Sequence, residues 1–240
     1  MVAGSAFAFA QPLMAPLRIG YWTRRLRRNL AIVGLALVVY LIVVTATSHS
    51  SQVMFRLSMA TGYTSVVLIG WALLIGPWRV MRGRSAPVST DLRRDVGIWG
   101  GLFGVAHVAT GLFVHLGDPL KYFFYRGTGR ALPVRYDLFG FANWSGLAAT
   151  LLLLLLLLIS NDVSLRRLGS RRWKSWQRWT YWAGGLVAAH GLAYQWIEKG
   201  NGGWAWVFVP VVIIVGAMQL DGRRRFLARR VEVSDAATGD

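Results

Sequence analysis

Residues 93–116 read RRDVGIWGGLFGVAHVATGLFVHL, an apolar stretch that carries His107 near its middle and His115 near its end. A second apolar stretch, WQRWTYWAGGLVAAHGLAYQW at 176–196, places His190 in the same way. Each stretch has the length of a membrane-spanning helix, and a buried imidazole without a hydrogen-bond partner costs on the order of a few kcal/mol. Both histidines therefore need a partner, and two imidazoles on facing helices are an established way to bind haem iron.

The composition indicates a membrane protein. Charged residues make up 15% of the 240 residues, below the roughly 25% that is usual in soluble domains. The 27 Lys and Arg residues are clustered between long uncharged runs, which is typical of membrane topology and not of a nucleic-acid-binding surface. The chain has no cysteine, which excludes disulfides, iron–sulfur clusters and thiol catalysis. We expect membrane lipid around the protein and no nucleic acid partner.

Six apolar runs predict an all-α integral membrane protein, a bundle of six transmembrane helices. Each run is close to the ~20 residues that cross a bilayer core. The predicted spans are 30–47, 57–76, 95–116, 141–159, 178–197 and 204–220. The chain is thus divided into an N-terminal segment 1–29 at the cytoplasmic surface, a six-helix transmembrane domain 30–220 and a cytoplasmic tail 221–240.

The distribution of Lys and Arg predicts the orientation of the bundle. Of the 27 residues, 21 lie in the N-terminal segment, the second and fourth connections and the tail, and six lie in the other connections. Because connections rich in Lys and Arg stay in the cytoplasm, both termini are predicted to lie there. We expect a multi-pass protein of a bacterial cytoplasmic (inner) membrane.

The two histidines are predicted to lie at the same depth in the membrane. With both termini in the cytoplasm, the third and fifth spans run outward, and His107 and His190 each lie about 12 residues into their span, or roughly 18 Å along the helix. Two unrelated histidines would have no reason to share a depth. This agreement favours one cofactor bound between the two helices over separate packing or hydrogen-bonding roles.

Three glycines lie on the same helical face as His107. Gly100, Gly104 and Gly111 stand at −7, −3 and +4 from the histidine. Missing side chains on this face leave room for a flat macrocycle, although glycines also let two membrane helices approach closely, and that alternative stays open. We predict that these glycines line a cofactor site whose metal ligands are His107 and His190.

Other candidate residues have two interpretations each. His49 and His115 lie near the outer ends of the first and third spans, where an interfacial position is expected; His115 is otherwise a candidate for an electron exit or substrate site. Arg94 and Arg178 are candidate partners of haem propionates, but topology explains them equally well. The aromatic run 122–125 is predicted to lie at the membrane interface.

Residues 159–182 read ISNDVSLRRLGSRRWKSWQRWTYW. The elements S-N-D, L-R-R-L-G, R-W-K and R-x-x-Y resemble the ferric reductase-like transmembrane domain family, and within it the haem-binding membrane subunits of bacterial methionine sulfoxide reductase systems. The basic pair and glycine-rich helix before His107 also fit, so the resemblance covers about 75–220. It implies a six-helix bundle holding b-type haem between the third and fifth spans, with His107 and His190 as ligands.

The resemblance also implies a departure from the family pattern. Relatives often have a histidine where Gln177 stands, and two-haem relatives carry another near Arg93. The inner haem is therefore expected to be missing, leaving one haem in the middle or outer half of the membrane. Because only residues 221–240 follow the sixth span, no flavin or nicotinamide domain is expected, and quinol, a flavin or a partner protein is expected to supply electrons.

Three functional hypotheses follow. The first is a b-type cytochrome, the electron-transfer subunit of an oxidoreductase system, passing electrons from quinol or a flavin partner to an extracytoplasmic acceptor. Two imidazole ligands leave iron no open position, which favours electron transfer over oxygen chemistry. The second is a haem-free structural or accessory subunit of a larger membrane complex. The third is an enzyme reducing ferric chelates, with His115 and the basic loop 121–135 as its candidate outer site.

Overall fold

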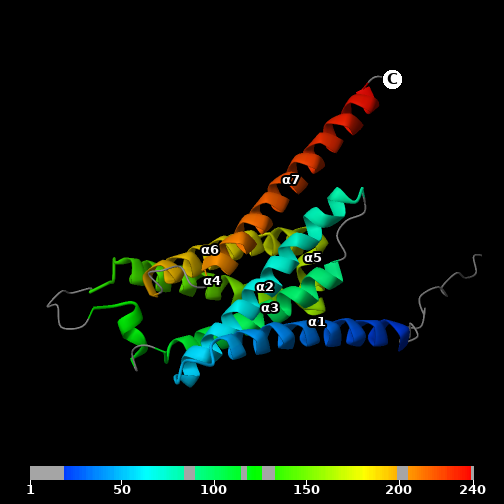
Figure 1. Cartoon of the computed structure of the whole chain (residues 1–240). Coiled ribbons are helices and arrows are strands. Elements are labelled where there is room, and N and C mark those ends of the chain that lie inside the picture. Colours follow the sequence, from blue (N-terminus) through cyan, green and yellow to red (C-terminus); the bar gives the residue numbers. More distant parts are fainter. Residues whose placement is uncertain (1–18, 84–89, 115–117, 126–132, 199–204, 239–240) are drawn as a thin grey trace, which may run out of the picture.

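The computed structural model describes residues 19–83, 90–114, 118–125, 133–198 and 205–238, and within these ranges the chain is mostly helical (Figure 1). The helices are α1 (Ile19–Ala46), α2 (Val53–Met81), α3 (Thr90–Gly111), the short 3-10 helix η1 (Pro119–Tyr122), α4 (Leu138–Ile159), α5 (Asp162–Gln177), α6 (Trp179–Glu198) and α7 (Ala205–Thr238). The predicted all-α class is confirmed for the described residues. Each predicted span corresponds to one long helix, and α5 occupies the basic connection between the fourth and fifth spans.

Three of the described helices are long and apolar enough to cross a membrane. They are Trp22–Ala46 of α1, Val53–Met81 of α2 and Leu138–Ile159 of α4, which supports a membrane protein. Helix α3 is less apolar because four charged residues stand near its start and glycines contribute little hydropathy. The count of six spans and the orientation of the termini stay predictions.

Helices α1 and α7 extend furthest beyond the predicted spans. Helix α1 already begins at Ile19, and α7 continues to Thr238. Figure 1 shows the later part of α7 extending away from the other helices. Arginine is a good helix former, so a basic stretch beside an apolar one continues the helix instead of ending it. The described parts of segments 1–29 and 221–240 are therefore extensions of α1 and α7.

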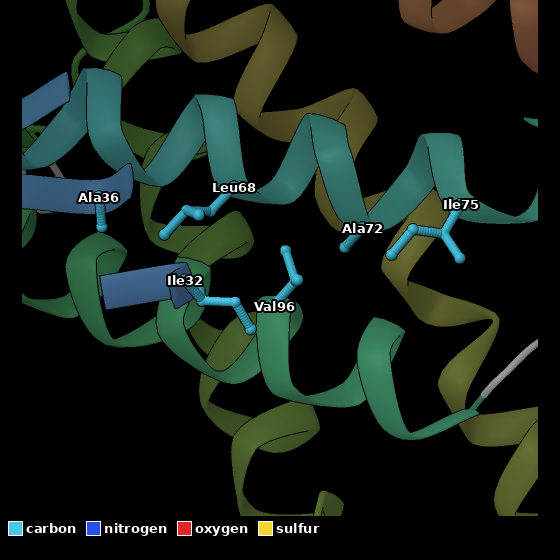
Figure 2. Packing of buried hydrophobic residues seen from close by; sticks show 6 residues of the cluster. All are labelled: Ile32, Ala36, Leu68, Ala72, Ile75 and Val96. Carbon is cyan, nitrogen blue, oxygen red and sulfur yellow. The ribbon is translucent and has the colours of Figure 1, made fainter. Parts of the chain in front are cut away.

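The central helices form two pairs. The contact of α2 with α3 is more extensive than its contact with any other helix, and the contact of α4 with α6 is likewise the most extensive one that α4 makes. We call these the α2–α3 pair and the α4–α6 pair. A core cluster joins α1 to the first pair, and Figure 2 shows its six side chains: Ile32, Ala36, Leu68, Ala72, Ile75 and Val96. A second cluster joins the two pairs: Ile69, Leu73, Leu153, Leu156 and Ala183.

A buried polar contact fixes α1 against α3. The Asp95 carboxylate is 2% exposed and accepts a hydrogen bond from Arg28 Nε at 2.7 Å, and Arg28 Nη2 pairs with the same oxygen. Asn29 Nδ2 donates to that oxygen at 3.3 Å, and Trp99 Nε1 donates to Asn29 Oδ1 at 3.0 Å. Arg28 thus has a structural partner in addition to the topological role that its position suggests.

Candidate functional site

The structure brings the two predicted histidines together. His107 on α3 and His190 on α6 have ring centroids 5.9 Å apart, with 76° between the ring planes. The rings come from different helix pairs, His107 from the α2–α3 pair and His190 from the α4–α6 pair. The site therefore lies at the boundary between the two pairs.

Each imidazole is held by a backbone carbonyl of the neighbouring helix. His107 Nδ1 lies 2.9 Å from the Ser58 carbonyl on α2, and His190 Nδ1 lies 2.7 Å from the Ala142 carbonyl on α4. Because a carbonyl oxygen only accepts hydrogen bonds, each Nδ1 carries the proton and each Nε2 keeps its lone pair. Within the described part of the chain, neither Nε2 has a hydrogen-bond partner. Both nitrogens are thus available to a metal.

A glycine stands one helical turn after each of these carbonyls. A Cβ atom at Gly62 would lie 2.8 Å from His107 Nδ1, and one at Gly146 would lie 2.5 Å from His190 Nδ1. Both distances are too short for a real Cβ, so any larger residue would displace the imidazole. We call a carbonyl and the glycine four residues later an imidazole seat.

The same seat occurs in both helix pairs. In the first, 49 residues separate Ser58 from His107, and in the second, 48 residues separate Ala142 from His190. The sequence analysis did not identify either seat. Its signal is a glycine inside an apolar helix, which becomes informative only once the paired helices are known.

Both imidazoles line a cavity of about 270 Å³ enclosed mainly by α2, α3, α4 and α6. Of the predicted glycines, Gly104 and Gly111 line this cavity. Gly100 does not: a Cβ there would lie 3.3 Å from the backbone nitrogen of Ile69 on α2. Gly100 therefore serves the close approach of α2 and α3, the alternative that the sequence left open.

The cavity also contains polar groups that the sequence analysis missed. Gln195 Nε2 donates to the Tyr63 hydroxyl at 2.6 Å, while Gln195 Oε1 is buried without a hydrogen-bond partner among the described residues. The Tyr194 hydroxyl donates to Asn143 Oδ1 at 2.8 Å. The signal in the sequence is an amide side chain within an apolar run, as at Asn143 and Gln195. In the cavity, Gln195 Oε1 offers a hydrogen-bond acceptor to a bound molecule.

Helix η1 and the residue after it cover one end of the cavity. Tyr122 is 2% exposed, and its hydroxyl donates to the Gly111 carbonyl at the end of α3, at 3.0 Å. Its ring stacks on Phe139, with 5.6 Å between ring centroids, and Phe123 contacts Trp144. Tyr122 is therefore buried within the bundle, where its hydroxyl bonds to a carbonyl that also accepts from Val114 N; the interfacial position of the run 122–125 stays a prediction.

The ligand set fits haem better than a bare metal ion. Among the residues that the structure describes, no group of three or more His, Asp or Glu side chains could hold a metal. A structural zinc ion usually needs four protein ligands, whereas haem brings its own equatorial nitrogens and needs only axial ones. His107 and His190, whose ring centroids lie 5.9 Å apart, are the residues that would hold the iron of such a group.

The remaining candidates lie elsewhere. Arg94 and Arg178 line a different cavity, where α3 and α6 begin, and neither lines the cavity of the histidines. The structure thus gives no support to their role as propionate partners. His49 is exposed in the connection between α1 and α2, and His115 lies outside the described residues.

Comparison of the chain with protein-family models, with curated proteins and with solved structures gives no match. The resemblance to the ferric reductase-like family, drawn from residues 159–182, therefore stays a prediction. What the site can do has to be inferred from its own geometry: two neutral imidazoles with free Nε2 atoms beside an apolar cavity.

Proposed function

We propose that the chain is a membrane-embedded b-type cytochrome that binds one haem between His107 and His190. In this role it transfers electrons from quinol or a flavin partner to an extracytoplasmic acceptor, as one subunit of an oxidoreductase system. One observation carries the proposal: each histidine has Nδ1 bound to a carbonyl and Nε2 free, and the rings stand 5.9 Å apart. A bound haem would supply the one-electron chemistry.

The surrounding residues have defined tasks in this proposal. The carbonyls of Ser58 and Ala142 fix the tautomer and raise the donor strength of Nε2, as hydrogen-bond partners of metal-bound histidines do. Gly62 and Gly146 keep the imidazoles in position. The apolar lining and Tyr122 exclude water, which governs both the redox potential and the access of other ligands.

The membrane arrangement is part of the same proposal. It comprises six spans in a bacterial inner membrane; the three apolar helices support membrane insertion, and the 21-to-6 distribution of basic residues favours both termini in the cytoplasm. A single haem is favoured because Gln177 provides an amide, not an imidazole, and its Nε2 donates to Ser160 Oγ at 3.3 Å. An electron donor on the cytoplasmic side is then a quinol, a flavin or a partner protein.

An absorption spectrum tests the proposal. Full-length protein purified after expression with added haem precursor should show a b-type spectrum and the electron paramagnetic resonance of a low-spin bis-imidazole haem. His107→Ala and His190→Ala should each abolish both signals, while His49→Ala, at an exposed position in a connection, should leave them intact. An unchanged spectrum in either ligand variant overturns the assignment. A folded protein without haem that co-purifies with a partner supports a structural subunit instead.

A further inference from the structure

A second cavity lies where α3 and α6 begin, at the end of the bundle that the proposed orientation places at the cytoplasmic surface. Its volume is about 570 Å³. Its apolar part is formed by Ile69, Ala72, Leu153, Leu156 and Leu157, and its cationic part by Arg93, Arg94, Lys174 and Arg178. Leu153 also lines the histidine cavity, so this one side chain borders both spaces.

The cationic groups of this second cavity are incompletely compensated. Its described lining includes no carboxylate, and only Arg94 has an ion-pair partner there, Asp162 at 2.6 Å. Arg93 lies over the ring of Tyr181 at 5.5 Å, and no described acidic group pairs with Lys174 or Arg178. Arg94 Nε is buried without a hydrogen-bond partner in the described part of the chain. The second cavity thus combines cationic side chains with a hydrogen-bond donor, Arg94 Nε, that has no partner among the described residues.

Two helices begin and two helices end at this cavity. Helices α3 and α6 begin at Thr90 and Trp179, while α4 ends at Ile159 and α5 at Gln177, so the partial charges of the helix ends offset one another and the positive potential comes from the side chains. The side of the cavity formed by α5 is held in place, because Trp173 of α5 is buried and its Nε1 donates to the Ile159 carbonyl at 2.8 Å. Trp173 therefore fixes α5, which carries Lys174, beside the cavity, while the side chains of Lys174 and Arg178 themselves are exposed.

We propose that this cavity binds a phosphate group carried on an apolar body. The negative charge of the phosphate is balanced by Arg93, Lys174 and Arg178. The apolar body lies along Leu153, Leu156 and Leu157. A small inorganic anion would leave the apolar part uncovered, and an uncharged apolar molecule would leave the cations uncompensated. Two sources share this chemistry: an anionic phospholipid of the surrounding leaflet, which basic pockets between membrane helices bind, and a soluble phosphate ester.

Binding of short-chain lipids tests the proposal independently of haem. Full-length protein in detergent is titrated with dihexanoyl-phosphatidylglycerol, dihexanoyl-phosphatidylcholine, hexyl phosphate and inorganic phosphate, and bound molecules are measured by native mass spectrometry and calorimetry. The double variant Arg93→Gln/Lys174→Gln should weaken phosphatidylglycerol binding about tenfold or more. The matched control Arg171→Gln/Arg172→Gln removes the same charge from exposed positions of α5 and should change binding less than about twofold.

A second variant fills the cavity without changing its charge. Gly97 lines the cavity, and a Cβ there would meet nothing within 4 Å, so Gly97→Leu places a side chain in open space. It should abolish phosphatidylglycerol binding and leave binding of inorganic phosphate intact. The haem spectrum should survive in every variant, which separates this proposal from that of the histidine site.

The outcomes are distinct. Selective phosphatidylglycerol binding that depends on the cavity residues supports the phospholipid source. Equally tight binding of hexyl phosphate, a soluble monoester, with the same dependence on these residues supports a soluble ester, whereas phosphate binding with no gain from an apolar group overturns the proposal. Equal weakening by the cavity and control variants overturns the proposal, because general surface charge would then explain the binding. Absence of saturable binding by these anions also overturns it.

Discussion

An imidazole that binds a metal has to present one nitrogen with a free lone pair, and in this protein the neighbouring helix decides which nitrogen that is. His107 and His190 could be predicted from sequence because depth along a span follows from residue count alone. Gly62 and Gly146 could not, because a glycine becomes part of a seat only when a particular turn of α2 or α4 faces a particular histidine. That pairing is tertiary information.

At the residue scale, we expect Gly146→Ala to impair haem binding. Its Cβ would lie 2.5 Å from His190 Nδ1, so the ring has to leave the carbonyl of Ala142. Gly185→Ala, on the same helix as His190, is the control because a Cβ there meets nothing within 4 Å. It should keep full haem content and gain up to about 1 kcal/mol of stability from helix propensity. Haem per protein and thermal midpoints measure both effects; normal haem content in Gly146→Ala contradicts the seat.

At the scale of elements, the long helices were predictable and their ends were not. A span is predicted from the average hydropathy of many residues, which tolerates local exceptions. Its end depends on single residues, so α7 continues through a basic stretch to Thr238. Likewise, Gly169 interrupts α5 with a φ of 71°, and η1 is attached to α3 through a tertiary contact, the hydrogen bond from the Tyr122 hydroxyl to the Gly111 carbonyl. Neither feature has a periodic signature.

The start of α4 should make stability depend on pH. Asp137 caps this helix: its Oδ1 accepts from Gly140 N at 2.7 Å, and its Oδ2 pairs with Arg135 Nη2 at 2.6 Å. The hydrogen bond from Arg135 is the main reason that the pKa of Asp137 falls from 3.8 to about 2. A lowered pKa in the folded state means that the ionised carboxylate stabilises the protein above pH 3.8, and that this contribution is lost as pH falls toward 2.

Asp137→Asn isolates the charge, because asparagine keeps an oxygen for the cap. The thermal midpoint of the variant should lie below that of the unchanged protein above pH 3.8, and the difference should close as pH approaches 2. A difference that stays constant over this range would show that the carboxylate charge contributes nothing.

The contact between α1 and α3 should contribute more than an exposed ion pair. Asp95→Ala leaves the partly buried Arg28 without its partner and should cost about 2 kcal/mol of unfolding free energy. Asp221→Ala removes the pair with Arg225 on α7, where both side chains are more than a third exposed, and should cost no more than about 0.5 kcal/mol. Denaturant unfolding of both variants measures the difference, and equal losses would contradict the buried contact.

At the scale of the whole molecule, the orientation can be tested cleanly because the chain has no cysteine. Ser51→Cys, in the exposed connection between α1 and α2, should react in intact cells with a maleimide that cannot cross the inner membrane. Ser234→Cys, near the C-terminus, should react only after the membrane is permeabilised. The reverse pattern would invert the bundle and place the second cavity on the outer side.

The two imidazole seats belong to two helix pairs that touch each other less than the helices within each pair do. Neither pair alone offers more than one of the two histidines. A cofactor bound by one histidine from each side would consequently hold the α2–α3 pair and the α4–α6 pair together. Without the cofactor, the two helix pairs should separate before either pair unfolds. Thermal unfolding should therefore show two transitions in the cofactor-free protein and one transition in the cofactor-bound protein.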